Sequence, residues 1–239
     1  MSHKNKIAVL TGGGTAGHVI PHLALKPYFL KHGYTLFYIG TDKIEQQLAA
    51  QAGITFHTIY AGKLRRYLSW ENLRDFFLVG IGFLQSLIIL LRFRPSVVFS
   101  KGGYVSVPVC LAAYCLRIPV VSHESDLTPG LANRIIQRIA KKIFYAFFET
   151  KKYLPGSNCY HVGIPVREEL ASGEMEKGLA LTGFSKEDLR PILLVVGGSL
   201  GAERINQLIA SELKKLLEDY RIVHITGKGN KQPNDPSGY

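Results

Sequence analysis

Residues 7–17 read IAVLTGGGTAG, a short apolar run that passes directly into a glycine-rich turn. Two further glycine-rich turns, at residues 102–104 and 197–201, also follow apolar runs and precede helix-like stretches. Where a strand passes into a helix through such a turn, the free backbone amides and the helix dipole favour phosphate. The three turns together predict a protein that handles a phosphorylated or diphosphorylated substrate.

Strand-like and helix-like segments alternate along the chain. Strands are predicted at residues 7–11, 35–39, 54–59, 97–100, 120–122, 142–146, 192–196 and 221–226. Helices are predicted at residues 21–31, 42–52, 71–92, 107–116, 130–140 and 202–219. This order indicates an α/β protein with a parallel sheet covered on both faces and with its ligands at the carboxyl ends of the strands.

The alternation breaks near Gly163, and a charged segment follows. Beyond that segment only one βαβ element remains, which buries too little surface for an independent domain. The predicted organisation is an N-terminal domain, a linker with a helix, and a partial second domain, at residues 1–163, 164–190 and 191–239.

The 239-residue chain has a formal net charge of +11, which favours anionic partners: nucleic acid, acidic lipid headgroups or phosphorylated substrates. Its three cysteines form no CxxC pair, as is typical of reduced thiols in a cytoplasmic protein. The first six residues are polar and lack the apolar core of a secretory signal. We therefore expect a protein that stays inside the cell.

Residues 76–91 read FFLVGIGFLQSLIILL. A helix of this length is too short to span a hydrocarbon core that needs about 20 residues, so we expect it not to cross the membrane. It is either buried between the sheet and its neighbours or exposes one face to an anionic bilayer surface. The basic residues that would surround such a face are Lys63, Arg65, Arg66, Arg74, Arg92 and Arg94. The apolar residues predicted for the membrane patch are Trp70, Phe76, Phe77, Leu78, Phe83 and Leu84.

His18 follows the last glycine of the first turn and would lie at a helix N-terminus. The helix dipole lowers the pKa of an imidazole there, and a neutral imidazole beside an anion site can act as a general base. The alternative is a structural histidine. A second polar cluster, residues 122–126, follows a strand on the same rim of the sheet.

That second cluster allows two further interpretations. His123, Glu124 and Asp126 are N and O donors close together in sequence, but adjacent side chains point in different directions and no second cluster completes a metal site. Asp126 could instead cap the helix that follows. We therefore predict no bound metal.

The first turn also fits the G-x-G-x-x-G pattern of dinucleotide-binding folds. A nicotinamide-dependent oxidoreductase needs an acidic residue at the tip of the second strand, whereas Asp42 comes after Gly40 and Thr41. This alternative also leaves His18 and the other two turns unexplained.

Five motifs together carry a specific resemblance, in order across residues 5–227. They are GGGTAGHVIP at 12–21, SKGGYVSVP at 100–108, SHESDLTPGLANR at 122–134, GIPVR at 163–167 and GGSLGAERIN at 197–206. The chain resembles the MurG glycosyltransferase family of bacterial peptidoglycan synthesis. The resemblance implies a GT-B fold with two Rossmann-like domains, the second partial here.

The activity that this resemblance implies is transfer of N-acetylglucosamine, with inversion, from UDP-N-acetylglucosamine to the C4 hydroxyl of the muramoyl sugar of lipid I, which gives lipid II. It also implies a peripheral protein at the anionic cytoplasmic face of the bacterial membrane, with no cofactor and no nucleic-acid partner. A split, non-catalytic subunit that only docks at the membrane or binds the acceptor is the alternative.

The family pattern assigns roles to positions in this chain. His18 becomes the candidate base, with Glu124 and Asp126 as the other catalytic candidates. Donor-binding residues are expected at Thr15, Ala16, Gly17, Arg167, Gly198, Ser199 and Gly201. The acceptor diphosphate is expected at Gly13, Gly14, Gly102, Gly103, Tyr104 and His123.

The chain departs from the family pattern at three positions: Ala16 replaces a glycine, Asp126 an asparagine and Leu200 a glutamine. Roles assigned to the two amides do not carry over. Members of the family also continue through the rest of the second domain. We therefore expect a truncated protein or gene fragment, weak or inactive by itself.

Overall fold

The computed structural model describes residues 6–62, 70–198 and 201–227, with the backbone alone for residues 70–74. The chain divides into two compact units, Met1–Glu168 and Glu169–Tyr239. The division falls inside the predicted linker at 164–190, and the three domain bounds given above stay a prediction.

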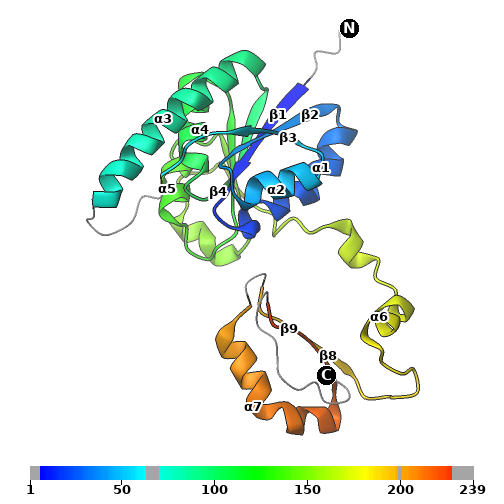
Figure 1. Cartoon of the computed structure of the whole chain (residues 1–239). Coiled ribbons are helices and arrows are strands. Elements are labelled where there is room, and N and C mark those ends of the chain that lie inside the picture. Colours follow the sequence, from blue (N-terminus) through cyan, green and yellow to red (C-terminus); the bar gives the residue numbers. More distant parts are fainter. Residues whose placement is uncertain (1–5, 63–69, 199–200, 228–239) are drawn as a thin grey trace. The chain divides into compact units, whose positions relative to one another are not determined.

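Unit 1 contains a seven-stranded sheet in which every neighbouring pair is parallel (Figure 1). The strand order is β3-β2-β1-β4-β5-β6-β7. The strands are β1 (Lys6–Gly12), β2 (Tyr34–Gly40), β3 (Thr55–Thr58), β4 (Val97–Gly102), β5 (Val120–Glu124), β6 (Lys142–Tyr145) and β7 (Cys159–His161). The order reverses between β1 and β4, which makes their carboxyl ends the point where such sheets bind ligands.

Helices cover both faces of this sheet, as predicted. They are α1 (Ile20–Lys31), α2 (Ile44–Gln51), α3 (Trp70–Phe93), α4 (Ser106–Cys115) and α5 (Leu131–Gln137). Unit 1 also contains the short 3-10 turns η1 (Ala16–His18) and η2 (Phe148–Tyr153), and a third such turn, η3 (Glu168–Ala171), begins at its last residue. Alternate residues of β1 point to opposite faces. Ala8 and Leu10 belong to the cluster packed by α1 and α2, whereas Val9 belongs to the cluster packed by α3, α4 and α5.

One stripe of α3 is buried: Gly82, Ser86 and Leu90, spaced four residues apart. At Gly82 a Cβ would lie 1.8 Å from the carbonyl oxygen of Tyr60, so only glycine allows this approach. Gln85 accepts a hydrogen bond from the Tyr60 amide, and Ser86 donates one to the Gly82 carbonyl. Gln85 therefore helps to hold α3 against the rest of unit 1, whereas the Ser86 hydroxyl is satisfied within the helix itself.

The helix is longer than the apolar run suggested. α3 has 24 residues, and residues 75–93 are long and apolar enough, by length and composition, to cross a membrane. The sequence argument that the segment is too short to span was therefore wrong, because the helix extends beyond the run at both ends.

Unit 2 contains α6 (Met175–Thr182) and the predicted βαβ element, which is β8 (Ile192–Val196), α7 (Glu203–Asp219) and β9 (Arg221–Ile225). The two strands form a separate parallel pair. Alternate residues of β8 (Ile192, Leu194 and Val196) are exposed. One face of this small sheet is thus apolar and uncovered in the described part of the chain.

Candidate active site

The first two glycine turns meet at the carboxyl ends of β1 and β4, as the topology predicts. Gly14 has a φ of +87° and Gly103 a φ of +79°, values that favour glycine. A Cβ on Gly103 would lie 2.3 Å from the carbonyl oxygen of Gly13, and one on Gly14 would lie 2.8 Å from the ring of Tyr104. The two turns therefore interlock, and they bring together Gly13, Gly14, Gly102, Gly103 and Tyr104.

Glu45 of α2, which the sequence analysis did not single out, lies buried behind the first turn. Its carboxylate accepts hydrogen bonds from the amide and the hydroxyl of Thr41, and from the Gly14 amide at 3.5 Å. A Cβ on Gly13 would lie 2.5 Å from this carboxylate. Glu45 thus shapes the first turn, and the Gly14 amide faces a carboxylate of the protein.

His18 ends η1, one residue before the N-cap of α1, and is half-buried. Its Nδ1 lies 3.1 Å from the carbonyl oxygen of Lys101. Because a carbonyl only accepts, Nδ1 carries the proton and Nε2 has the lone pair. Burial, and then the positive charge of Lys101, lower the pKa of His18. A neutral imidazole with a free basic nitrogen therefore lies at this rim, and burial rather than the predicted helix dipole is the main cause.

His123 of β5 is buried, and both of its ring nitrogens are occupied. Nε2 donates to the carbonyl oxygen of Gly163 at 2.8 Å, and Nδ1 accepts from the ammonium of Lys101 at 2.8 Å. Burial, and then the charge of Lys101, lower the pKa of His123 to about 4. No ring nitrogen of His123 is left for a metal ion.

Glu124 is also buried, and both carboxylate oxygens are used. One accepts from the Asp126 amide at 2.8 Å and the other from the side chain of Asn133 at 2.7 Å. A Cβ on Gly102 would lie 2.3 Å from the Asn133 side chain, so these groups support the second glycine turn. Asp126 itself is exposed. The described residues contain no group of three or more His, Cys, Asp or Glu side chains placed to hold a metal ion.

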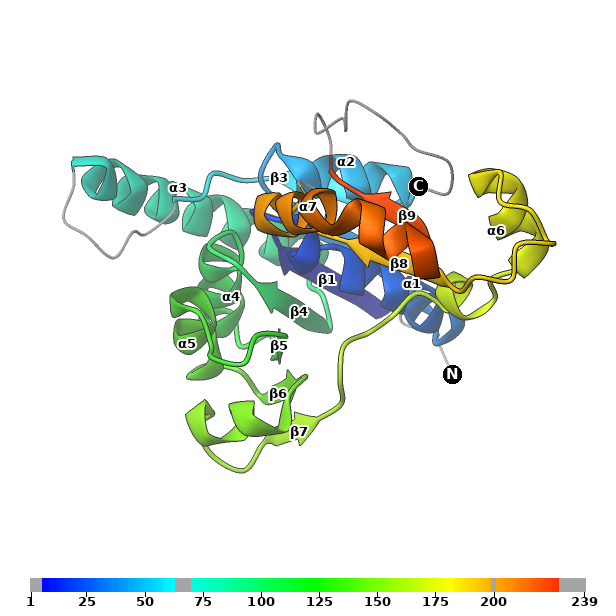
Figure 2. The ribbon, with the colours of Figure 1, turned by 90° about the horizontal axis from the view of Figure 1, so that it is seen from below.

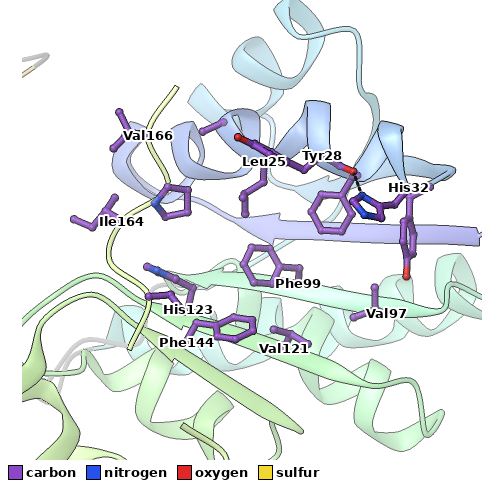
Figure 3. A pocket seen from close by; sticks show the side chains of 15 residues that line it. Leu25, Tyr28, His32, Val97, Phe99, Val121, His123, Phe144, Ile164 and Val166 are labelled. Carbon is purple, nitrogen blue, oxygen red and sulfur yellow. Dashed lines mark hydrogen bonds between the residues drawn. The ribbon is translucent and has the colours of Figure 1, made fainter. Parts of the chain in front are cut away.

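A cavity of about 660 Å³ lies on the α1 face of β4, β5 and β6 (Figure 3). Its lining is mainly apolar and includes Leu25, Phe29, Phe99, Val121, Phe144 and Ile164. Of the predicted site residues only His123 borders it. Residues 162–166 run along the cavity, and the hydrogen bond from His123 to Gly163 fixes this segment.

The predicted donor residues belong to both units. In unit 1 Thr15, Gly17 and Arg167 are exposed and Ala16 is half-buried. In unit 2 Gly198 and Gly201 have φ values of +82° and +79°, and Ser199 lies outside the described residues. Their donor-binding roles stay predictions.

The predicted membrane patch is only partly exposed. Phe76, Phe77 and Leu84 are 59–67% exposed, whereas Leu78 is half-buried and Phe83 packs against the core. The exposed face continues along α3 through Ile81, Ile88 and Leu91, which the sequence analysis left out. Of the surrounding basic residues, Arg92 and Arg94 are exposed. The side chains of Trp70, Lys63, Arg65, Arg66 and Arg74 lie outside the described residues.

Two family models match the chain. The glycosyltransferase family 28 N-terminal domain matches residues 8–145, and the glycosyltransferase family 28 C-terminal domain matches residues 192–239. The first match covers β1 to β6 with both interlocked turns, and the second covers the βαβ element of unit 2.

Among similar proteins, a Bacillus cereus protein is 47% identical over 226 residues, and a Shouchella clausii protein is 49% identical over 229 residues. Both are named UDP-N-acetylglucosamine–N-acetylmuramyl-(pentapeptide) pyrophosphoryl-undecaprenol N-acetylglucosamine transferase, the former with the number 2. The matches cover 94% and 95% of this chain. The chain spans 64% of the length of each relative.

Solved structures agree with this result. The crystal structure of Acinetobacter baumannii MurG is 27% identical, with a TM-score of 0.68 over 94% of this chain and 59% of that one. The glycotransferase of kitacinnamycin, 12% identical with a TM-score of 0.64 over 98% of this chain and 70% of that one, shares the fold alone. The predicted GT-B fold class is confirmed. The interlocked glycine turns, the rim histidine and the family match over more than half of the chain establish that this protein belongs to glycosyltransferase family 28.

Proposed function

We propose that this chain provides the acceptor-binding part of an N-acetylglucosaminyltransferase. The sugar would move from UDP-N-acetylglucosamine to the C4 hydroxyl of the muramoyl sugar of lipid I, to give lipid II. The observation that carries the proposal is the neutral His18 beside two interlocked glycine turns, in a chain whose relatives bear that activity in their names.

In this proposal His18 Nε2 accepts the proton of the attacking C4 hydroxyl. The new bond forms between that oxygen and the anomeric carbon while the bond to UDP breaks on the opposite side, so the configuration inverts. Glu124 is the weaker candidate base because both of its oxygens already accept hydrogen bonds. Asp126, which is exposed, stays the second candidate.

The departing UDP needs positive potential for its diphosphate. The glycine turn that precedes α7 in unit 2 is proposed for it, because a helix N-terminus stabilises phosphate charge. Arg167, in unit 1, stays a separate prediction for the donor, since an arginine also pairs with phosphate. The paired phosphates of lipid I would bind at the turns of β1 and β4. Gly102 and Gly103 both have positive φ. The Gly102 amide already donates to the Ser100 hydroxyl at 3.1 Å, so the Gly103 amide is the donor proposed for the phosphates in the second turn.

The exposed face of α3 is proposed as a contact with the anionic cytoplasmic surface of the membrane. Apolar side chains along one face with arginines at one end are typical of helices that lie in the interface. The opposite stripe of α3 is buried in unit 1 and consists of Gly82, Ser86 and Leu90. If α3 spanned the bilayer, this stripe would leave the core of unit 1. We therefore propose peripheral attachment.

Binding of a short-chain lipid I analogue to the chain tests the acceptor site. Gly103→Ala is expected to weaken binding at least tenfold, because its Cβ would press on the Gly13 carbonyl. Gly130→Ala is the matched control, since no heavy atom of the described residues, apart from its chain neighbours, lies within 4 Å of its Cβ, and its φ is −65°. Circular dichroism checks that both variants are folded. If the two folded variants bind the analogue equally well, the acceptor does not bind at these turns.

A further inference from the structure

Lys101 is the most unusual buried residue of unit 1. It is the second-last residue of the apolar strand β4 and is 1% exposed. Its ammonium donates to His123 Nδ1, and no other hydrogen bond of this ammonium occurs in the described part of the chain. No described carboxylate lies within ion-pair distance of it. A lysine is rarely buried without a paired charge, so this one needs an explanation.

The charge of this ammonium acts on histidines from three elements. They are His18 of η1, His22 of α1 and His123 of β5, and for each the positive charge of Lys101 is the largest cause, after burial, that lowers the pKa. The carboxylates of Glu124 and Asp126 act in the opposite direction on His18. Residues 162–166, which also pack here, include no titratable side chain, and Arg167 beyond them is exposed.

We propose that Lys101 is a positioning residue for the reaction proposed above, because its carbonyl orients His18 and its ammonium anchors His123. The positive charge of the ammonium adds to burial in disfavouring the protonated form of His18. The inference rests on the proposed function of His18 as the base. It assigns to Lys101 no contact with substrate.

The orientation follows from hydrogen-bond chemistry. The Lys101 carbonyl can only accept, so it selects the His18 tautomer with a proton on Nδ1 and leaves Nε2 free as the base. The Gly163 carbonyl selects the opposite tautomer of His123, with the proton on Nε2 and the lone pair facing the Lys101 ammonium. One residue thereby fixes two rings in opposite tautomers.

The hydrogen bond between Lys101 and His123 also bears on residues 162–166, which follow β7. His123 lies beside Ile164 in Figure 3, and its bond to Gly163 holds residues 162–166 along the cavity. If the ammonium were removed, His123 Nδ1 would lose its donor. We therefore expect the Lys101 side chain to affect both the base and the position of this segment.

Titration of the histidine Cε1–H signals by NMR in the 239-residue chain tests the proposal without any substrate. Lys101→Met removes the charge and the donor, whereas Lys101→Gln removes the charge but keeps a donor for His123. His18→Gln assigns the His18 signal among the eight histidines. Lys31→Met is the control, because it removes the same charge from an exposed position at the end of α1.

Both Lys101 variants should make His18 titrate about one pH unit or more higher, because at an effective dielectric constant near 20 a unit charge about 10 Å away already contributes about that much. Lys31→Met should leave it unchanged. Only Lys101→Met should also shift the backbone amide signals of residues 162–166 strongly. An unchanged His18 titration in a folded Lys101 variant overturns the proposal.

The wild-type protein gives an independent outcome if neither variant folds. Nitrogen-15 shifts must show His18 protonated on Nδ1 and His123 on Nε2, and the opposite tautomer at either ring contradicts the proposal. These NMR measurements do not depend on sugar transfer. A failed transfer assay would therefore contradict the proposed function without changing the measured tautomers or titrations of the histidines.

Discussion

At the scale of single residues, burial decides the chemistry of the rim histidines. His18, His22 and His123 all have pKa values below the ordinary 6.5, and burial is the first cause in each case. The rim therefore holds neutral imidazoles at neutral pH. This is the protonation state that a base acting on a sugar hydroxyl needs.

The lowered pKa of His123 predicts how stability depends on pH. Its pKa is about 4 when folded and near 6.5 when unfolded, so between these values only the unfolded chain binds the proton. The free energy of unfolding should therefore fall as the pH drops from 6.5 to about 4, by up to about 1.4 kcal/mol per pH unit. Urea unfolding at pH 7, 5.5 and 4.5 measures this.

His123→Asn is the matched variant, because asparagine does not titrate in this range. Its unfolding free energy should depend less on pH than that of the wild type, and other titrating groups, among them His18 and His22, account for the remaining slope. The same pH dependence in both proteins would contradict the buried, neutral state assigned to His123.

Some of the site could be predicted from the sequence and some could not. The glycine turns were predictable because positive φ is a local requirement, and His18 because it adjoins the first turn. Lys101 and Glu45 were missed, because their partners are distant in sequence: His123 is 22 residues from Lys101, and Gly14 is 31 residues from Glu45. A lone charge beside a buried strand is the signal that could have revealed Lys101.

At the scale of elements, long periodic segments were predicted to within a few residues. β7 was missed because its three residues are too few to show a period, and η2 because a single 3-10 turn has no apolar pattern. In α3 the sequence indicated an apolar helix, but the packed stripe depends on Gly82, whose approach to Tyr60 is a tertiary contact.

The exposed face of α3 gives a prediction at this scale. Phe77→Glu combined with Ile88→Glu should weaken binding of the chain to anionic vesicles at least tenfold, because both side chains are more than 60% exposed and each would contribute about 1–2 kcal/mol on entering the interface. Sedimentation with vesicles containing phosphatidylglycerol measures the effect.

Leu181→Glu is the control for vesicle binding, since Leu181 of α6 is 89% exposed and lies in unit 2. Binding should also weaken with salt if Arg92 and Arg94 contribute. If the control and the α3 variant lose vesicle binding equally, the added negative charge explains the loss, and the exposed face of α3 has no specific role.

At the scale of the whole molecule, the two units differ in how well they are packed. Unit 1 has a seven-stranded sheet covered on both faces, whereas unit 2 has two strands with Ile192, Leu194 and Val196 exposed. Amides of β8 and β9 should therefore exchange with solvent about a hundredfold faster than those of β1 and β4. Hydrogen exchange followed by mass spectrometry measures this, and equal protection would contradict the difference.

The family was accessible from sequence because five motifs occur in order over most of the chain, and the comparisons confirm it. Figure 2 shows the strands from β1 and β4 to β7 in succession, the arrangement that brings the first three of these motifs to one rim. The fold and family thus follow from local patterns, whereas the electrostatic state of the rim depends on tertiary contacts.

Transfer of radiolabelled N-acetylglucosamine from UDP-N-acetylglucosamine to a short-chain lipid I analogue decides whether this chain supplies the base of a transferase. The assay compares the 239-residue chain with the same chain joined to the part of the Bacillus cereus relative that lies beyond the match. We predict transfer by the extended protein and a loss of about a hundredfold or more with His18→Gln, the usual range for removing a general base. An extended protein that binds both substrates but transfers nothing would contradict the proposed reaction, and one that keeps its full rate with His18→Gln would contradict the role of His18 as the base.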